Sequence, residues 1–225
     1  PSPPVDSQAL AELVSATRAV IVQSECGSHP AEYRIRYLPV MVNTVGIETP
    51  SGFRQFQLHH GSSIRLSCDL LVVSARCTPE GEVEGQMAKA ITSRYGMRLD
   101  PKKRFMNLGP EMWTSLEEAP DTAPFSHVMV LWLPGDWELT NAEGDAEAYE
   151  HAIRGVFANL LAAEHQGLQL KTIGLDFLGG HRSQGLDTAV ETLLFSAIRW
   201  MKRAERAETI SLALSYRNQL EDANA

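Results

Sequence analysis

Four short apolar runs, each bounded by turn-forming or polar residues, are spread along the chain. They are CDLLVVSA at 68–75, HVMVLWLP at 127–134, TIGLDFLG at 172–179 and TISLALSY at 209–216. Runs of this length between turn signals are typical of strands that are covered on both faces. We therefore expect these four segments to form the centre of a sheet.

Two further segments alternate between apolar and polar residues, as half-buried strands do. They are YRIRYLPVMV at 33–42 and FRQFQLHH at 53–60. Pro39 would place the first at a sheet edge or a bulge, because proline cannot donate to a strand ladder. Residues 43–52 are rich in turn-forming residues and predict a turn, and the acidic, proline-containing segment 111–126 predicts irregular structure.

Helical periodicity marks four other segments, at about 7–17, 83–95, 146–167 and 186–206. In the second half of the chain these helices alternate with the apolar strands, which is typical of an α/β fold. We expect a three-layer α/β/α sandwich with a mixed central sheet. Residues 1–52 would be an N-terminal helix and strand extension packed on a domain at 53–225, and the two would form one compact unit.

Charge and composition argue against several classes of function. A net charge of −8 and a pI near 5.4 argue against broad binding to DNA or RNA, although one small anionic ligand needs only a local positive site. No apolar run approaches the roughly 18 residues of a membrane helix. The three cysteines lack metal or disulfide spacing, so we expect a cytoplasmic protein without metal or cofactor. The missing initiator Met predicts a processed chain or part of a longer one.

Two loops follow apolar runs and lead into helices, at Ser74–Glu84 and Gly179–Gly185. Ligands of open α/β sheets lie at the carboxyl ends of strands, beside such loops. Backbone N–H groups of Gly179–Gly185 could hold a phosphate, with Arg182 adding a charged contact. The same glycines also suit a plain turn from strand to helix, with Arg182 in solvent. Both interpretations remain open at this point.

The order of these segments resembles a macro domain. The resemblance is carried by FQLHHGSSIRLSCDLLVVSA, EGEVEGQMAKAITSRYG, FSHVMVLWLP, YEHAIRGVFANLLAAEHQGLQLKTIGLDFLGG and TISLALSY, which together cover about 53–216. Macro domains similarly combine a G-D-I-T-like turn, an asparagine-bearing loop, a glycine-rich helix start and an S-x-G-x-x-G-like phosphate loop. The resemblance implies a macro-like fold and a nucleotide ligand related to ADP-ribose.

This chain departs from the family pattern at several motif positions. Ser62 stands where the family has the acidic residue that holds the adenine amino group. SARCTPEG replaces the asparagine-bearing loop, EGEVEG replaces the glycine run, and GGHRSQG forms the phosphate loop. Because the usual hydrolase residues are absent, the resemblance implies a binding module rather than an enzyme.

The two loops and the resemblance together predict a set of ligand-binding residues. They are Ser74, Ala75, Arg76, Thr78, Gly81, Gly179, Gly180, His181, Arg182, Ser183, Gln184, Gly185 and Tyr216. Tyr216 is included because some macro domains place an aromatic residue there that stacks on adenine.

No catalytic residue is assigned, and three residues are kept as candidates: Cys77, His181 and Asp176. Cys77 would need a histidine base, for which His59, His60 and His181 are the choices. Asp176 lies in an otherwise apolar run, where a carboxylate is costly unless it is paired. It would either face the ligand or pair with Arg154 or Arg199 of a neighbouring helix.

The sequence thus predicts a non-hydrolytic module that binds or senses an ADP-ribose-like or other nucleotide ligand and regulates a linked or neighbouring effector. Two alternatives remain: an ADP-ribosyl or nucleotide hydrolase with a rearranged active site, and a macro-like protein-interaction scaffold. No nucleic-acid or membrane partner is expected. The oligomeric state and a fused effector are left open.

Overall fold

A single mixed sheet organises the computed structural model, which describes residues 8, 11–16, 39–109, 111–135, 146–178 and 186–214. The elements are β1 (Val40–Thr49), β2 (Gly52–His60), the short 3-10 helix η2 (Ser63–Arg65), β3 (Cys68–Cys77), β4 (Val83–Glu84), α2 (Gln86–Tyr95), β5 (Met106–Asn107), β6 (Trp113–Glu118), β7 (Phe125–Leu133), α3 (Ala146–His165), β8 (Thr172–Leu175), α4 (Leu186–Met201) and β9 (Thr209–Leu214). Residues 11–16 are also helical.

The strands follow the order β1-β2-β9-β8-β3-β7-β6-β5, with β4 paired to β3. The five strands β2, β9, β8, β3 and β7 run parallel to one another, while β1, β6 and β5 add antiparallel edges. The four apolar runs predicted as central strands form β3, β7, β8 and β9. The mixed sheet between helical layers confirms the predicted α/β/α sandwich.

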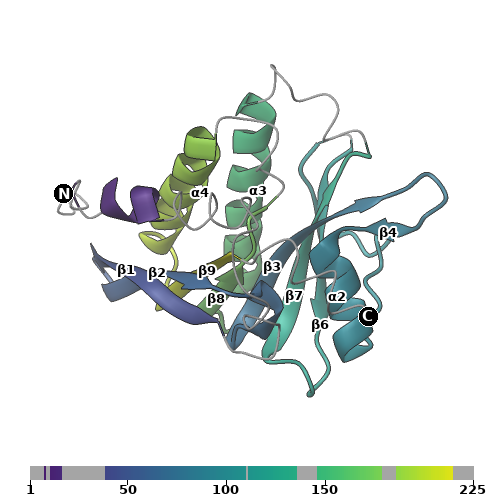
Figure 1. The fold of residues 1–225 in the computed structure, drawn as a ribbon, viewed down its shortest axis with the longest axis horizontal. Helices are drawn as coiled ribbons and strands as arrows, with labels where there is room; N and C mark the ends of the chain where they lie inside the picture. Colours follow the sequence, from purple (N-terminus) through teal and green to yellow (C-terminus); the bar gives the residue numbers. More distant parts are fainter. Residues whose placement is uncertain are drawn as a thin grey trace, which may run out of the picture.

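Helices cover both faces of the sheet (Figure 1). The larger hydrophobic core lies on the face of α3 and α4, which pack side by side, and the smaller lies under α2 and η2. Alternation along β3 serves both cores, because Leu70 and Val72 enter the first while Leu71 and Val73 enter the second.

Two segments predicted to be irregular are strands. Residues 43–49 belong to β1, which pairs with β2 and buries Val45 and Ile47 in the larger core. Residues 113–118 form β6, in which Thr114 and Ser115 are buried as well. Their hydroxyl groups are bonded to Asn159 and Trp132, at 2.9 Å each, so polar residues occupy core positions without loss of hydrogen bonds. The expectation of irregular structure was therefore wrong here.

The segment after β3 also differs from expectation. The predicted helix at 83–95 begins only at Gln86, because Val83 and Glu84 pair with Cys77 and Arg76 as β4. The helix ends as predicted before Gly96, which has a φ of +66°. Residues 17–38 of the predicted N-terminal extension lie outside the described residues. None of the described helices has the length and apolar character to cross a membrane.

Candidate functional site

The chain leaves the neighbouring strands β8 and β3 in opposite directions. From β3 it passes through α2 toward β6 and β7, whereas from β8 it passes through α4 to β9 on the other side. The helix that follows β3 covers one face of the sheet and the helix that follows β8 covers the other. Such a divergence is a topological switch point, and ligands of open α/β sheets bind outside the carboxyl ends of the strands there.

The predicted phosphate loop falls outside the described residues. Gly179–Gly185 and Tyr216 are among the residues that the structure does not describe, so their predicted contacts stay predictions. The flanking elements are described. The loop connects the carboxyl end of β8 to the first turn of α4, which is the position that the sequence predicted for it.

The predicted wall at Ser74–Glu84 is a β-hairpin. Thr78, Pro79, Glu80 and Gly81 form its turn, in which the Gly81 N–H donates to the Thr78 carbonyl at 2.9 Å. The Thr78 N–H and Oγ1 are bonded to the Glu82 backbone as well. Proline at the second position and glycine at the fourth are common in such turns, and Gly81 has a φ of +86°. Thr78 and Gly81 therefore have a structural role in the hairpin.

The other residues of this loop that were predicted to bind a ligand lie in the core or in the hairpin. Ala75 is 2% exposed and lies in the smaller core. Arg76 pairs across the hairpin with Glu84, at 3.6 Å. Ser74 lies where α2 begins, and its carbonyl oxygen would be 3.2 Å from a Cβ placed on Gly85. Gly85 thus allows the start of α2 to approach β3 closely.

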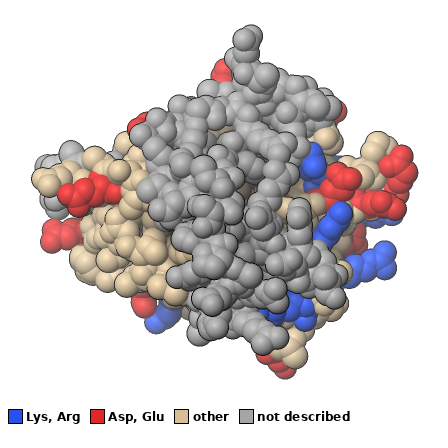
Figure 2. Space-filling view, viewed as in Figure 1, with Lys and Arg blue, Asp and Glu red and all other residues tan. Residues whose placement is uncertain are grey.

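The hairpin projects from the body of the molecule (Figure 1). Glu80, Glu82 and Glu84 are all exposed, and Figure 2 shows acidic atoms gathered on that side. These residues form a solvated rim around the hairpin turn. Their charge would repel a polyphosphate at the hairpin tip, which favours a ligand position near the sheet.

The structure separates Cys77 from its proposed base. Two strands, β9 and β8, lie between β2 and β3, so His59 and His60 are at least ~14 Å from Cys77 at the usual strand spacing. Asp176 is level with Val73 by register and is therefore ~13 Å short of Cys77 along β3. The described candidates thus do not form a nucleophile–base pair. Among the described residues, no group of three or more His, Cys, Asp and Glu side chains is arranged to hold a metal ion.

Asp176 directly follows β8, at the switch point. Its backbone N–H extends the sheet ladder by donating to the Val72 carbonyl at 3.0 Å. Because Ile173 and Leu175 face α3 and α4, alternation turns Asp176 to the other face of the sheet, where it meets Ser63 of η2. Arg154 is bonded to Glu150 instead. The predicted pairing of Asp176 with a helix arginine was therefore wrong for Arg154.

The surroundings of Asp176 disfavour its charge. Ser63 Oγ lies 3.4 Å from Asp176 Oδ1 and also 3.4 Å from Met87 Sδ. Burial raises the pKa of the Asp176 carboxyl to about 6, and hydrogen bonds from the Phe177 backbone and from Ser63 oppose this rise only in part. A perturbed carboxyl at the carboxyl end of a central strand is typical of a functional site.

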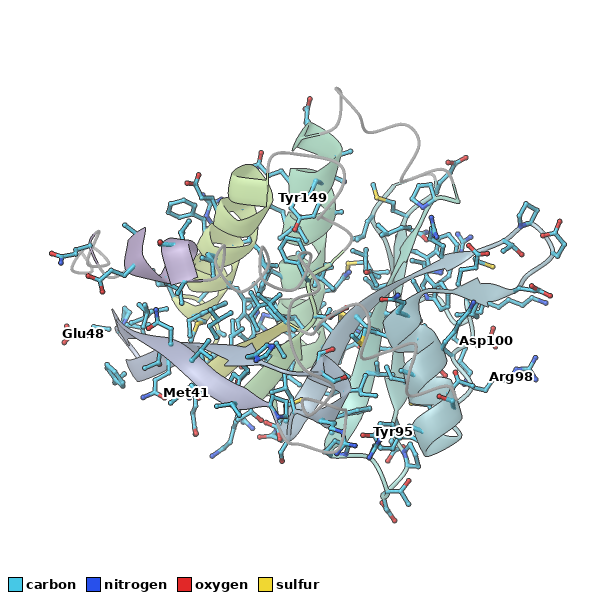
Figure 3. All side chains as sticks on the ribbon, in the orientation of Figure 1. Met41, Glu48, Tyr95, Arg98, Asp100 and Tyr149 are labelled. Carbon is cyan, nitrogen blue, oxygen red and sulfur yellow. The ribbon has the colours of Figure 1, made fainter. Side chains whose placement is uncertain are left out.

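The η2 segment that carries Ser63 is held in place by α2. The Tyr95 hydroxyl donates to the Ile64 carbonyl at 2.8 Å, and the Tyr95 ring packs edge-on against Phe125. Figure 3 shows Tyr95 beside the end of α2. Ser63 itself is fully buried, and the neighbouring Ser62 Oγ is buried with no hydrogen-bond partner among the described residues.

Sequence reasoning singled out Asp176 but missed Ser63 and Met87. Both lie far from Asp176 in the chain. Ser63 follows Ser62 in the GSSI turn and Met87 follows the EGEVEG segment, but neither residue type by itself indicates a ligand contact. The only available signal was the helix-forming segment after EGEVEG, which predicts that α2 begins near the end of β3. Nothing in the sequence indicates that η2 would close over the same point.

Comparison with known proteins gives a consistent result for the fold. No family model matches the chain, and no curated protein matches it. Two variants of the Oceanobacillus iheyensis macrodomain are similar in structure, with TM-scores of 0.57 and 0.52 at 13% and 11% identity. They cover 85% and 80% of this chain and 95% and 93% of their own. The Trypanosoma brucei macrodomain in complex with ADP has a TM-score of 0.50 at 15% identity, covering 74% of this chain and 66% of that one. The chain therefore has the macrodomain fold.

Proposed function

We propose that this protein binds a nucleotide of the ADP-ribose type without hydrolysing it. The observation that carries the proposal is the switch point between β8 and β3. There the chain diverges to opposite faces, and the predicted glycine loop follows β8. A macrodomain of similar fold was solved in complex with ADP, which supports the same class of ligand.

Binding without turnover is supported by the hairpin that follows β3. Its polar groups bond to one another across the turn, and Arg76 pairs with Glu84. Asp176 and Cys77 lie too far apart to act on one bond. The proposed role is therefore to recognise the nucleotide and, through this binding, to sense it.

The test is a thermal-unfolding titration with ADP-ribose, NAD, ADP and inorganic phosphate as separate ligands. A ligand that binds only the folded state stabilises it by about 2.7 kcal/mol at one hundred times Kd, which is ~5–10 °C for a domain of this size. We expect such a shift with ADP-ribose or ADP and none with phosphate. The absence of a shift with every nucleotide would reject the proposal and favour the scaffold.

Two controls separate binding from hydrolysis. Chromatography of the incubated ADP-ribose should show no product, and product formation would favour the hydrolase alternative. Arg182→Ala should weaken binding about tenfold or more, because a charge-assisted contact with phosphate is lost. Equal binding by this variant would show that the glycine loop does not hold the phosphate.

A further inference from the structure

Among the described residues, no cationic side chain is paired with the Asp176 carboxylate. Its interactions with the described residues are a hydrogen bond from the Phe177 backbone and the distant Ser63 hydroxyl, at 3.4 Å. A hydrogen bond of that length is weak. A carboxylate has room for about four hydrogen bonds, and the half-buried Asp176 side chain uses few of them on the described residues, which is costly for a partly desolvated group.

The carboxylate is nevertheless held firmly in position. The Asp176 N–H continues the β8 ladder onto β3, so the backbone at this residue is fixed by the sheet. Ser63, which lies next to the carboxylate, belongs to η2. The hydrogen bond from Tyr95 of α2 to the Ile64 carbonyl holds η2 in place. A costly group on a rigid support is the arrangement expected of a binding residue rather than of a packing residue.

Asp176 also stands at the position where a ligand would be expected on topological grounds alone. It is the first residue after β8, and the predicted phosphate loop begins three residues later, at Gly179. A nucleotide bound at the switch point between β8 and β3 would have hydrogen-bonding groups within reach of the ends of these strands. The hydrogen-bonding groups of a nucleoside that a carboxylate can accept are amino N–H and hydroxyl O–H groups.

We propose that Asp176 determines the specificity of this site, its carboxylate accepting a hydrogen bond from an amino or hydroxyl group of the bound nucleoside, with Ser63 as the residue that positions it. The inference rests on the proposed nucleotide binding and deepens it. It assigns to the end of β8 a recognition role that the family pattern does not carry there.

The experiment compares Asp176→Asn with Asp69→Asn by calorimetric titration of ADP-ribose. Asp69 lies on the same pair of strands at the opposite edge, so its variant makes an identical chemical change away from the site. We expect Asp176→Asn to bind about 10- to 100-fold more weakly, since a hydrogen bond to a charged acceptor is lost, and Asp69→Asn to bind like wild type. Ser63→Ala should bind about two- to fivefold more weakly, because only the positioning group is lost.

Two altered ligands identify the donor. If the amino group is recognised, the hypoxanthine counterpart of ADP-ribose binds wild type about tenfold more weakly but binds Asp176→Asn as ADP-ribose does. If a ribose hydroxyl is recognised, the 2′-deoxy or 3′-deoxy counterpart behaves in this way instead. Equal affinity of wild type and Asp176→Asn for ADP-ribose would overturn the inference and leave nucleotide binding standing. A wild type that binds no nucleotide would overturn both.

Discussion

Asp69 and Asp176 lie at opposite ends of one pair of parallel strands, β3 and β8, and their carboxylates are bonded very differently. Asp69 Oδ2 accepts hydrogen bonds from the Lys171 and Thr172 backbone N–H groups at 2.8 Å each and from Thr172 Oγ1 at 3.0 Å. Among the described residues, Asp176 has a single side-chain donor, Ser63, at 3.4 Å. One carboxylate joins the strands, and the other has capacity left for a ligand.

The first prediction is that the same substitution has opposite effects on stability at these two positions. At pH 8, Asp69→Asn should lower the free energy of unfolding by about 1–3 kcal/mol, because hydrogen bonds to a charged acceptor are weakened. Asp176→Asn should raise it by about 1–2 kcal/mol, because a desolvated charge is removed. Urea denaturation measures both. Destabilisation by Asp176→Asn would indicate a structural role for that carboxyl.

The second prediction concerns pH. The folded pKa of Asp176 is about 6, above the ordinary 3.8, so the folded state holds this proton more tightly than the unfolded state does. The contribution of Asp176 to the free energy of unfolding is therefore most favourable below pH ~4. It decreases as pH rises from ~4 to ~6 and is constant above that, and the total decrease is at most about 3 kcal/mol. The difference in unfolding free energy between wild type and Asp176→Asn should follow this curve. A difference that does not change between pH 4 and 7 would contradict it.

The third prediction separates two glycines at the hairpin. Gly85→Ala should destabilise the protein by about 2–4 kcal/mol, because its φ is +134° and the added Cβ would lie 3.2 Å from the Ser74 carbonyl oxygen. Gly81→Ala is the matched control. It also has a positive φ, but nothing lies within 4 Å of its Cβ, so a loss of about 1 kcal/mol is expected. Similar losses at both positions would mean that the close approach of α2 to β3 does not matter.

The fourth prediction concerns the two described cysteines. Cys68 is buried, and burial raises the pKa of its thiol to about 12, so it should resist iodoacetamide at pH 8 until the protein unfolds. Cys77 is partly exposed and should react first. Peptide mass spectrometry gives the two rates. Protein alkylated at Cys77 should still bind ADP-ribose. Loss of binding would indicate that Cys77 lies at the ligand-binding site.

Strands with a continuous apolar sequence were predictable, whereas strands that depend on their partners were not. The runs that form β3, β7, β8 and β9 are apolar because both of their faces are covered. The sequence of β6 contains Thr114 and Ser115 and therefore looks like an exposed segment. Both residues are buried because they have hydrogen-bond partners on other elements. β1 was missed for a similar reason, since its Asn and Gly residues suggest a turn and only pairing with β2 makes it a strand.

The site was predictable to the level of its loops. Sequence order placed a glycine loop and a second loop after central strands, and it singled out Asp176 as a carboxylate in an apolar run. The contact of Asp176 with Ser63 spans 113 positions in the chain, so it depends on tertiary structure alone. The TPEG turn was readable in principle, because Pro79 and Gly81 occupy the favoured positions of a tight turn, but the segment was interpreted as an open loop.

The sheet separates two hydrophobic cores of unequal size, and Asp176 faces the smaller one, under η2 and α2. A nucleotide held by this carboxylate would therefore restrain mainly one side of the molecule. Amide hydrogen exchange would slow in η2 and the first turns of α2, while the interior of α3 would exchange at its unliganded rate. Ligand binding would thus reduce local opening in η2 and α2 but not in α3. A neighbouring protein in contact with α2 would then meet a more rigid surface.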